Sequence, residues 1–319
     1  MISVQNLETT FYLKQGPVKA IDDISYKIEK GKTLGVVGES GCGKSVTSLS
    51  IMGLLENPGR VTKGKIIFQG TDLVGLSDQE MRKVRGKKAA MIFQEPMTAL
   101  NPVLTIGYQI DEQLLQHNKK MSKSEAKERS IELLDLVGIP APKQRYSNYP
   151  HQLSGGMRQR ALIAMALSCN PDFLIADEPT TALDVTIQAQ ILDLIQSLQD
   201  QFNMAVQFIT HDLGVISEVA DDILVMYAGR VCEKAPAEEI FKQPRHPYTA
   251  ALLQSIPKLG QKANRLPTIE GSVPALINRP IGCAFQNRCP FVTEQCVKSR
   301  PPIKQVSANH EVACFNHLG

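Results

Sequence analysis

Apolar and polar residues alternate along the first part of the chain, from Ile2 to Ile28. Such alternation, rich in β-branched residues, is typical of strands with one buried face. A turn at 15–17 interrupts the pattern, so we predict an antiparallel pair of strands. Thr33 to Val37 is instead a continuous apolar run bounded by glycines, as expected of a parallel strand that is buried on both faces.

Helical and strand patterns alternate along the middle of the chain. A helix is predicted from Lys44 to Leu55, directly after the buried strand, and a charged helical insertion is predicted at about 96–158. Further helices are predicted at 155–168 and 186–201, and further strands at 173–176 and 205–210. Strands that alternate with helices favour a parallel sheet, so we predict the α/β class.

The pattern changes near Ala235, where frequent prolines replace the regular elements. Paired apolar runs at 223–227 and 230–233 predict a hairpin that closes the sheet. Because proline disfavours long helices and strands, we predict a main domain at 1–235 and a small, loop-rich second domain at 236–319.

Composition narrows the class of protein. The 319 residues are 43% apolar and 21% charged, close to the average of soluble globular proteins. The net charge of +3 is too small to indicate a nucleic-acid partner. No apolar run reaches the roughly 20 residues that span a bilayer, and the start of the chain lacks the pattern of a signal peptide. We therefore expect a chain without a transmembrane segment that is not secreted.

A glycine-rich segment between the predicted strand and helix carries the first candidate chemistry. Glycines there let backbone N–H groups surround phosphate oxygens at the positive end of the helix. We expect Lys44 to bind the β- and γ-phosphates of ATP and Ser45 to bind Mg²⁺, whereas the alternative is a plain turn with an exposed lysine. Residues 38–45 of this segment fit G-x-x-x-x-G-K-[ST]. The expected ATP contacts are these residues and the one that follows them, namely Gly38, Glu39, Ser40, Gly41, Cys42, Gly43, Lys44, Ser45 and Val46.

Two neighbouring acids, Asp177 and Glu178, follow the apolar run that starts at Phe173. Ligands of open α/β sheets bind at the carboxyl ends of strands, so we expect both acids at the nucleotide. We assign Asp177 to Mg²⁺ and Glu178 to the orientation and deprotonation of the attacking water. Helix capping is the alternative role for Glu178.

A second phosphate-binding pattern, Leu153-Ser154-Gly155-Gly156-Met157, lies before that strand. A hydroxyl and bare backbone N–H groups at a helix N-terminus form an anion cradle, and one nucleotide does not need two cradles. The segment resembles the signature of the ATP-binding cassette (ABC) family, although Met157 replaces a frequent glutamine. The resemblance covers residues 1 to about 235. It implies a P-loop NTPase (RecA-like) core with an antiparallel β subdomain, and a dimer in which each signature binds the partner's ATP.

Other positions match the family one at a time. Gln94 resembles the glutamine that contacts Mg²⁺ and leads into the helical subdomain. Asp184 resembles an acid of the loop that crosses the dimer interface, and it also suits a helix N-cap. His211 resembles the histidine at the γ-phosphate. Phe11 or Tyr12 resembles the aromatic residue that stacks on adenine, with Phe11 slightly favoured.

The tail resembles the carboxyl-terminal region of the oligopeptide and dipeptide transporter ATPases, some of which serve nickel. The segments that carry this resemblance are His246-Pro247-Tyr248, Gly282-Cys283-Ala284-Phe285 and Arg288-Cys289-Pro290. It implies a peripheral subunit on the cytoplasmic face of the cell membrane. The implied partners are two transmembrane permease subunits, a second ATPase that is a paralogue or the same chain, and, indirectly, an extracytoplasmic peptide-binding protein.

Four of the seven cysteines cluster in the tail, at Cys283, Cys289, Cys296 and Cys314. In a chain without export signals, crowded cysteines suggest a metal site before disulfides. Four thiolates suit a [4Fe–4S] cluster, which the resemblance also implies, or Zn²⁺, and we favour the cluster on ligand type. Unliganded thiols are the remaining alternative.

These observations predict the ATP-hydrolysing subunit of an importer. It would drive the uptake of dipeptides or oligopeptides, or of nickel, through its membrane partners. The alternative is a metal- or redox-sensing ATPase switch whose output is the cysteine cluster.

Overall fold

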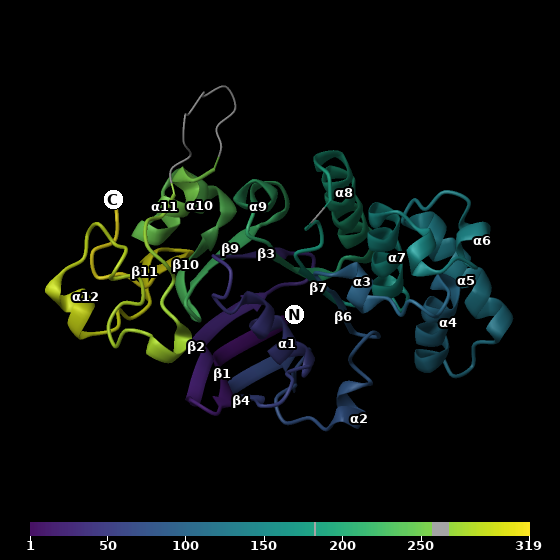
Figure 1. Ribbon diagram of the computed structural model, residues 1–319, viewed down its shortest axis with the longest axis horizontal. Helices are drawn as coiled ribbons and strands as arrows, with labels where there is room; N and C mark the ends of the chain where they lie inside the picture. The colour runs from purple at the N-terminus through teal and green to yellow at the C-terminus, as the bar shows by residue number, and fades with distance from the viewer. Residues whose placement is uncertain (182, 257–267) are drawn as a thin grey trace. The chain divides into compact units, whose positions relative to one another are not determined.

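The chain folds into two compact units (Figure 1). The computed structural model describes residues 1–181, 183–256 and 268–319. Unit 1 consists of 1–28, 33–75 and 208–319, and unit 2 consists of 29–32 and 76–207. Both contain helices and strands, which confirms the predicted α/β class. Within the described ranges, no helix is both long enough and apolar enough to span a bilayer.

Unit 1 contains an antiparallel sheet in the order β2-β1-β4-β5, and Figure 1 labels β2, β1 and β4 of this sheet. Its strands are β1 (Ile2–Leu13), β2 (Gly16–Ile28), β4 (Gly59–Phe68) and β5 (Thr71–Asp72). Ile2 pairs with Ile28 and Leu13 with Gly16, so β1 and β2 form the predicted strand pair. The alternating apolar side chains, among them Val4 and Ile24, are buried on one face, which explains why the pattern predicted these strands.

A second sheet of unit 1 has the strand order β11-β12-β10-β9-β3. All five residues of β3 are buried, and β3 runs parallel to β9. β9 and β10 form the predicted hairpin. The strands are β3 (Thr33–Val37), β9 (Asp222–Tyr227), β10 (Arg230–Pro236), β11 (Lys304–Ser307) and β12 (His310–Val312), and the helices of the unit are α1 (Lys44–Met52), α9 (Leu213–Val219), α10 (Ala237–Lys242), α11 (Pro247–Gln254), the 3₁₀ turn η2 (Leu276–Asn278) and α12 (Glu294–Lys298).

The proline-rich tail shares the core of unit 1. β12 extends the sheet by pairing with β10. Tyr227 of β9 packs edge-on against Tyr248 of α11 and Phe285, with ring centroids 4.7 and 5.3 Å away, and all three side chains are fully buried. The tail therefore has only short elements, as its prolines predicted, and gains its stability from apolar surface contributed by the preceding strands.

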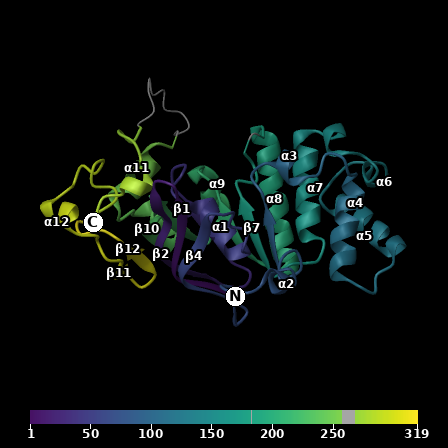
Figure 2. The same ribbon diagram turned by 60° about the horizontal axis from the view of Figure 1, so that its bottom comes forward.

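Unit 2 combines strands in the order β8-β7-β6, of which β6 and β7 run parallel, with a group of helices. β6 and β7 are wholly buried, and the last residues of β8 belong to unit 1. Helices α4, α5 and α7 pack against one another (Figure 2). The elements are α2 (Asp78–Met81), β6 (Ala89–Ile92), α3 (Pro96–Ala99), α4 (Ile106–His117), α5 (Lys123–Leu136), α6 (Pro142–Arg145), the 3₁₀ turn η1 (Pro150–Gln152), α7 (Gly155–Leu167), β7 (Phe173–Asp177), α8 (Val185–Phe202) and β8 (Ala205–Ile209).

Candidate functional site

The glycine-rich segment of unit 1 forms a tight loop between β3 and α1, as predicted. Its glycines at 38, 41 and 43 all have positive φ, a conformation that residues with a Cβ atom rarely adopt. A Cβ atom on Gly38 would lie 2.2 Å from the carbonyl oxygen of Met226, and one on Gly43 would lie 2.7 Å from Ile21. Glycine is therefore required for the backbone to follow this path, and a glycine has no side chain that could cover its own N–H group.

Lys44 lies inside the loop that precedes it. Its ammonium donates hydrogen bonds to the carbonyl oxygens of Gly38, at 2.7 Å, and Glu39, at 3.2 Å. The side chain is buried, and Gly43, the N-cap of α1, has no side chain to cover the helix N-terminus. A cation and the positive end of a helix thus occupy the same loop, and both favour a polyphosphate anion.

Glu39 of the loop is held by two residues of the tail. The carboxylate of Glu39 accepts two hydrogen bonds from the Arg288 guanidinium, at 2.6 and 3.0 Å. The backbone N–H of Glu39 donates to the hydroxyl of Tyr248, at 2.9 Å. In the sequence, Tyr248 and Arg288 belong only to the segments that carry the family resemblance. These residues are too far apart in the chain for a sequence motif to predict their contact, which is seen only in the folded structure.

In unit 2, the parallel pairing of β6 and β7 brings the two predicted catalytic segments together. Asp177 ends β7 and is only 4% exposed. Glu178 follows at φ 48°, a strained conformation for a residue with a side chain. Its carboxylate accepts hydrogen bonds from the Gln94 amide and the Thr181 hydroxyl, each at 2.9 Å. A carboxylate fixed in this way can orient a water molecule and take its proton.

The signature segment of unit 2 lies at the start of α7. Ser154 is the N-cap, and its hydroxyl oxygen accepts a hydrogen bond from the Met157 N–H at 3.3 Å. Ser154 and Gly155 are exposed, whereas a Cβ atom on Gly156 would lie 2.9 Å from Ile187. The helix N-terminus is therefore exposed at Ser154 and Gly155, whereas Gly156 packs closely against Ile187.

Two other predicted residues are also exposed. Asp184 caps α8, because its carboxylate accepts a hydrogen bond from the Ile187 N–H at 2.9 Å. The capping role considered for Asp184 is thus confirmed, and a contact across a dimer interface stays a prediction. His211 lies in unit 1, just after β8, and is exposed.

The two candidate aromatic residues differ in their surroundings. Phe11 lies against Gly59, because a Cβ atom on that glycine would come within 2.6 Å of the phenyl ring. Tyr12 is 48% exposed, and the guanidinium carbon of Arg60 lies 5.0 Å from the centre of its ring. Tyr12 therefore offers more open ring surface than Phe11, which weakens the slight preference for Phe11.

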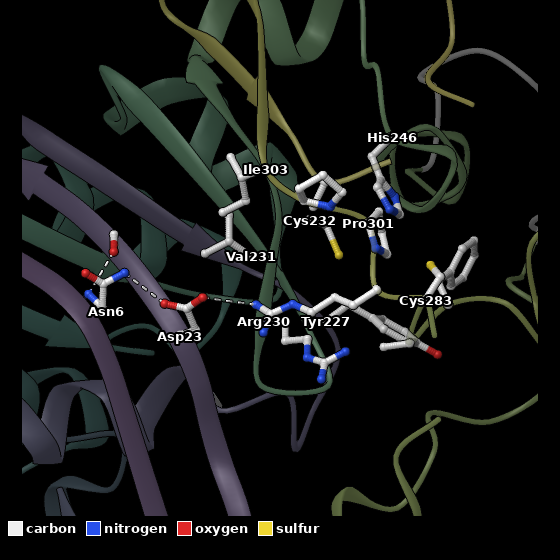
Figure 3. A pocket seen from close by; sticks show the side chains of 16 residues that line it. Asn6, Asp23, Tyr227, Arg230, Val231, Cys232, His246, Cys283, Pro301 and Ile303 are labelled. Atoms are coloured by element: carbon white, nitrogen blue, oxygen red, sulfur yellow. Dashed lines mark hydrogen bonds and ion pairs between the residues drawn. The ribbon is translucent and has the colours of Figure 1, made fainter. Parts of the chain in front are cut away.

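The four cysteines of the tail line one narrow cavity of unit 1, called the thiol cavity here, together with the rings of Phe285, Phe291 and Phe315. All four are free thiols. Burial raises the pKa of Cys314 to about 11 and also raises the pKa of Cys283 and Cys289. A neighbouring pocket is lined by Cys232, Cys283 and His246 on one side and by Asp23 and Arg230 on the other (Figure 3).

The predicted metal centre is not supported in the form of a single-ion site. Zn²⁺ needs four ligands at about 2.0–2.3 Å. Within the described residues, no group of three or more histidine, cysteine or acidic side chains is arranged to hold a metal ion. The Zn²⁺ alternative is therefore not supported by the described residues, and a bound cluster stays a prediction.

Comparison with known proteins assigns the family. Residues 21–181 match the family described as ABC transporter, and residues 232–296 match the family described as oligopeptide/dipeptide transporter, C-terminal region. The chain is 53% identical over 316 residues to the dipeptide transport ATP-binding protein DppD of Bacillus subtilis, covering 99% of this chain and 94% of the relative. It is 50% identical over 316 residues to the oligopeptide transport ATP-binding protein AppD of the same organism, covering 99% and 96%.

A solved structure shows the same fold in the cassette. The dimeric, post-hydrolysis state of the ATP-binding cassette MJ0796, bound to ADP and Pi, superposes with a TM-score of 0.68 at 28% identity, covering 74% of this chain and 99% of that chain. The chain belongs to the ABC transporter family, as its motifs predicted. The names of these two relatives support neither a nickel substrate nor the sensor alternative.

Proposed function

We propose that this chain is the ATP-binding and ATP-hydrolysing subunit of an importer of dipeptides or oligopeptides. The observation that carries the proposal is the extent of the similarity, since 99% of the chain aligns with DppD and the aligned part includes both the nucleotide motifs and the tail. As a peripheral subunit, it would act on the cytoplasmic face of the membrane with two transmembrane permease subunits, which receive peptide from an extracytoplasmic binding protein.

Unit 1 would supply the groups that hold the nucleotide. The loop N–H groups and Lys44 bind the β- and γ-phosphates, and Tyr12 or Phe11 stacks on adenine. Ser45, Asp177 and Gln94 are proposed as the residues that would hold Mg²⁺, which neutralises charge on the phosphate oxygens when bound. Buried Asp177 and the amide of Gln94 beside Glu178 support this donor set, because oxygen ligands are those that Mg²⁺ prefers.

Glu178 is proposed as the general base. Its carboxylate accepts a proton from water as the water oxygen attacks the γ-phosphorus. The bond from that phosphorus to the β-phosphate oxygen breaks, and ADP leaves with the bonding electrons. His211 would contact the γ-phosphate and help to hold the attacking water. The hydrogen bonds of Glu178 to Gln94 and Thr181 support the role, because they fix the carboxylate before the reaction.

The signature would complete the site of a second ATPase, either a paralogue or another copy of this chain. Ser154, Gly155 and Gly156 would contact the partner's ATP, and Asp184 would lie at the interface. The exposure of Ser154 and Gly155 supports this role, since a cradle for a partner's ligand has to be open to the outside.

Glu178→Gln tests the enzymatic part of the proposal. We expect the variant to bind ATP and form a closed dimer, with kcat lower by about 10² to 10⁴-fold, because the amide cannot take a proton. Steady-state hydrolysis of the purified chain, with its partner subunits, measures the effect. Glu132→Gln, which changes an exposed glutamate of α5, is the matched control. Normal turnover by Glu178→Gln would remove this residue from the role of base.

Uptake by cells tests the substrate class. Disruption of the gene should abolish the uptake of a radiolabelled dipeptide or tetrapeptide, and the wild-type chain should restore it whereas Lys44→Ala should not. Equal uptake with and without the chain would refute the peptide assignment and leave the ATPase assignment standing.

We also propose that the thiol cavity holds a [4Fe–4S] cluster. This feature is supported by four free thiols around one cavity and by the larger core of such a cluster, whose cysteine ligands do not converge on one ion. Anaerobically purified protein should show absorption at about 400 nm and about four iron atoms per chain. Protein with one zinc ion or no metal per chain would overturn the proposal.

A further inference from the structure

The side chain of Arg288, in the tail, contacts the phosphate loop and is held firmly in place. Its side chain is only 4% exposed, whereas that of its partner Glu39 is 29% exposed. The two side chains meet in the bidentate geometry that gives arginine–carboxylate pairs both strength and a fixed orientation.

Every N–H donor of Arg288 has an acceptor. Two bind the Glu39 carboxylate, one binds the hydroxyl of Tyr227 at 3.2 Å, and the others bind the carbonyl oxygens of Ile269 at 3.0 Å and Glu270 at 2.9 Å. Five satisfied donors fix the guanidinium before any ligand arrives, so the orientation of Glu39 is fixed as well.

The negative charge of Glu39 is unfavourable in a loop that is expected to bind phosphates. A carboxylate in a loop that receives phosphates repels them, and the repulsion is strong where solvent is partly excluded. Arg288 supplies the compensating charge and binds both oxygens of the carboxylate. Tyr248 and Lys44 hold the backbone of the same residue through its N–H and its carbonyl oxygen.

We propose that Arg288 is a positioning residue for ATP binding: it neutralises Glu39 and holds the carboxylate away from the phosphates. The tail thereby determines the nucleotide affinity of unit 1. This inference rests on the proposed function, since it assumes that the loop binds ATP.

Equilibrium binding of ATP, ADP and AMP, measured by displacement of a fluorescent ATP analogue, tests the proposal. We expect Arg288→Met to weaken ATP binding by about tenfold, ADP binding by less and AMP binding little, because the repulsion grows with phosphate charge near the loop. Added salt should reduce the difference from wild type, since salt screens charge. Glu39→Gln combined with Arg288→Met should restore ATP affinity to within about threefold of wild type, because no unpaired charge remains.

Arg300→Met is the matched control, because Arg300 is a tail arginine that pairs instead with Asp22 and Asp23. It should bind ATP like wild type. If Arg288→Met does not fold, as judged by thermal unfolding, the same comparison is made with Arg288→Gln. Equal ATP affinity of the Arg288 variant and wild type, or no recovery in the double variant, would overturn the inference. Failure of the wild type to bind ATP would instead overturn the proposed function.

Discussion

The chain has two candidate phosphate cradles at helix N-termini, and they are built in opposite ways. The loop before α1 is enclosed: Gly38 and Gly43 leave no room for a Cβ atom, and Lys44 is buried within the loop. The signature before α7 is open: Ser154 and Gly155 are exposed, and a Cβ atom on Gly155 would meet only Leu183, at 3.9 Å. Packing within the chain thus determines the first cradle and leaves the second available to a partner.

The difference shows how to separate residues needed for folding from residues needed for assembly. A glycine that is enclosed by backbone atoms is constrained by its own chain, and substitution there disturbs the loop in the monomer. An exposed glycine at a helix start has no such constraint, so any loss of activity on substitution points to another molecule. The three predictions below test this contrast.

Gly38→Ala should have the largest effect. Its new methyl group would meet the carbonyl oxygen of Met226, a backbone atom that cannot swing aside, at a positive φ. We expect ATP affinity to fall by at least about 100-fold, since the loop must leave its phosphate-binding shape. Gly41 also has a positive φ but lies in open space, so Gly41→Ala should lose about tenfold. Equal affinities for the two variants, measured by equilibrium binding, would contradict the enclosed-loop interpretation.

Acid should weaken the buried support of the phosphate loop. The Nδ1 atom of His246 accepts a hydrogen bond from the N–H of Tyr248, the residue that holds Glu39, and burial lowers the pKa of His246 to about 4. Because the folded-state pKa lies below the unfolded value of 6.5, this group's stabilisation is complete above pH 6.5 and is lost as the pH falls towards 4.

We expect this histidine to reduce the free energy of unfolding by about 2 kcal/mol between pH 8 and pH 5. His246→Asn retains a capping acceptor and does not titrate, so its unfolding free energy should fall less over the same range. Urea unfolding at the two pH values measures both slopes, and parallel slopes would exclude His246 as the cause.

Gly155→Ala should have the smallest effect on the monomer. The nearest atom outside its own helix is 3.9 Å from the new methyl group, so the free energy of unfolding should change by less than about 0.5 kcal/mol. If the signature binds a partner's ATP, hydrolysis by the assembled transporter should nevertheless fall by about tenfold or more, because a methyl group shields the cradle. Full hydrolysis by the variant would argue that the open cradle has no ligand.

Much of the fold could be predicted from the sequence because the patterns that specify each element lie within one short segment. The alternation from Ile2 to Ile28 predicted β1 and β2, and the predicted helix at 186–201 differs from α8 by one residue at each end. The loop at Gly38 was accessible for the same reason, since eight consecutive residues carry both the pattern and the geometry that it requires.

The tail was less accessible. Its prolines predicted short elements, and four cysteines predicted a common site, but their spacing does not say how far apart the sulfur atoms lie. The pairing of β12 with β10, and the packing of Tyr248 and Phe285 on Tyr227, depend on contacts between distant segments. Periodicity within one segment carries no information on such contacts.

By itself, the sequence determined the family, the order of the elements and the conformation of the phosphate loop, because each of these is encoded in contiguous residues whose backbone preferences act locally. Only the tertiary structure decided that the loop is supported by Arg288, a residue 249 positions away. A charged pair of this kind forms where folding buries the arginine and brings the polar atoms of both side chains within hydrogen-bonding distance, and the spacing of residues along the chain specifies neither condition.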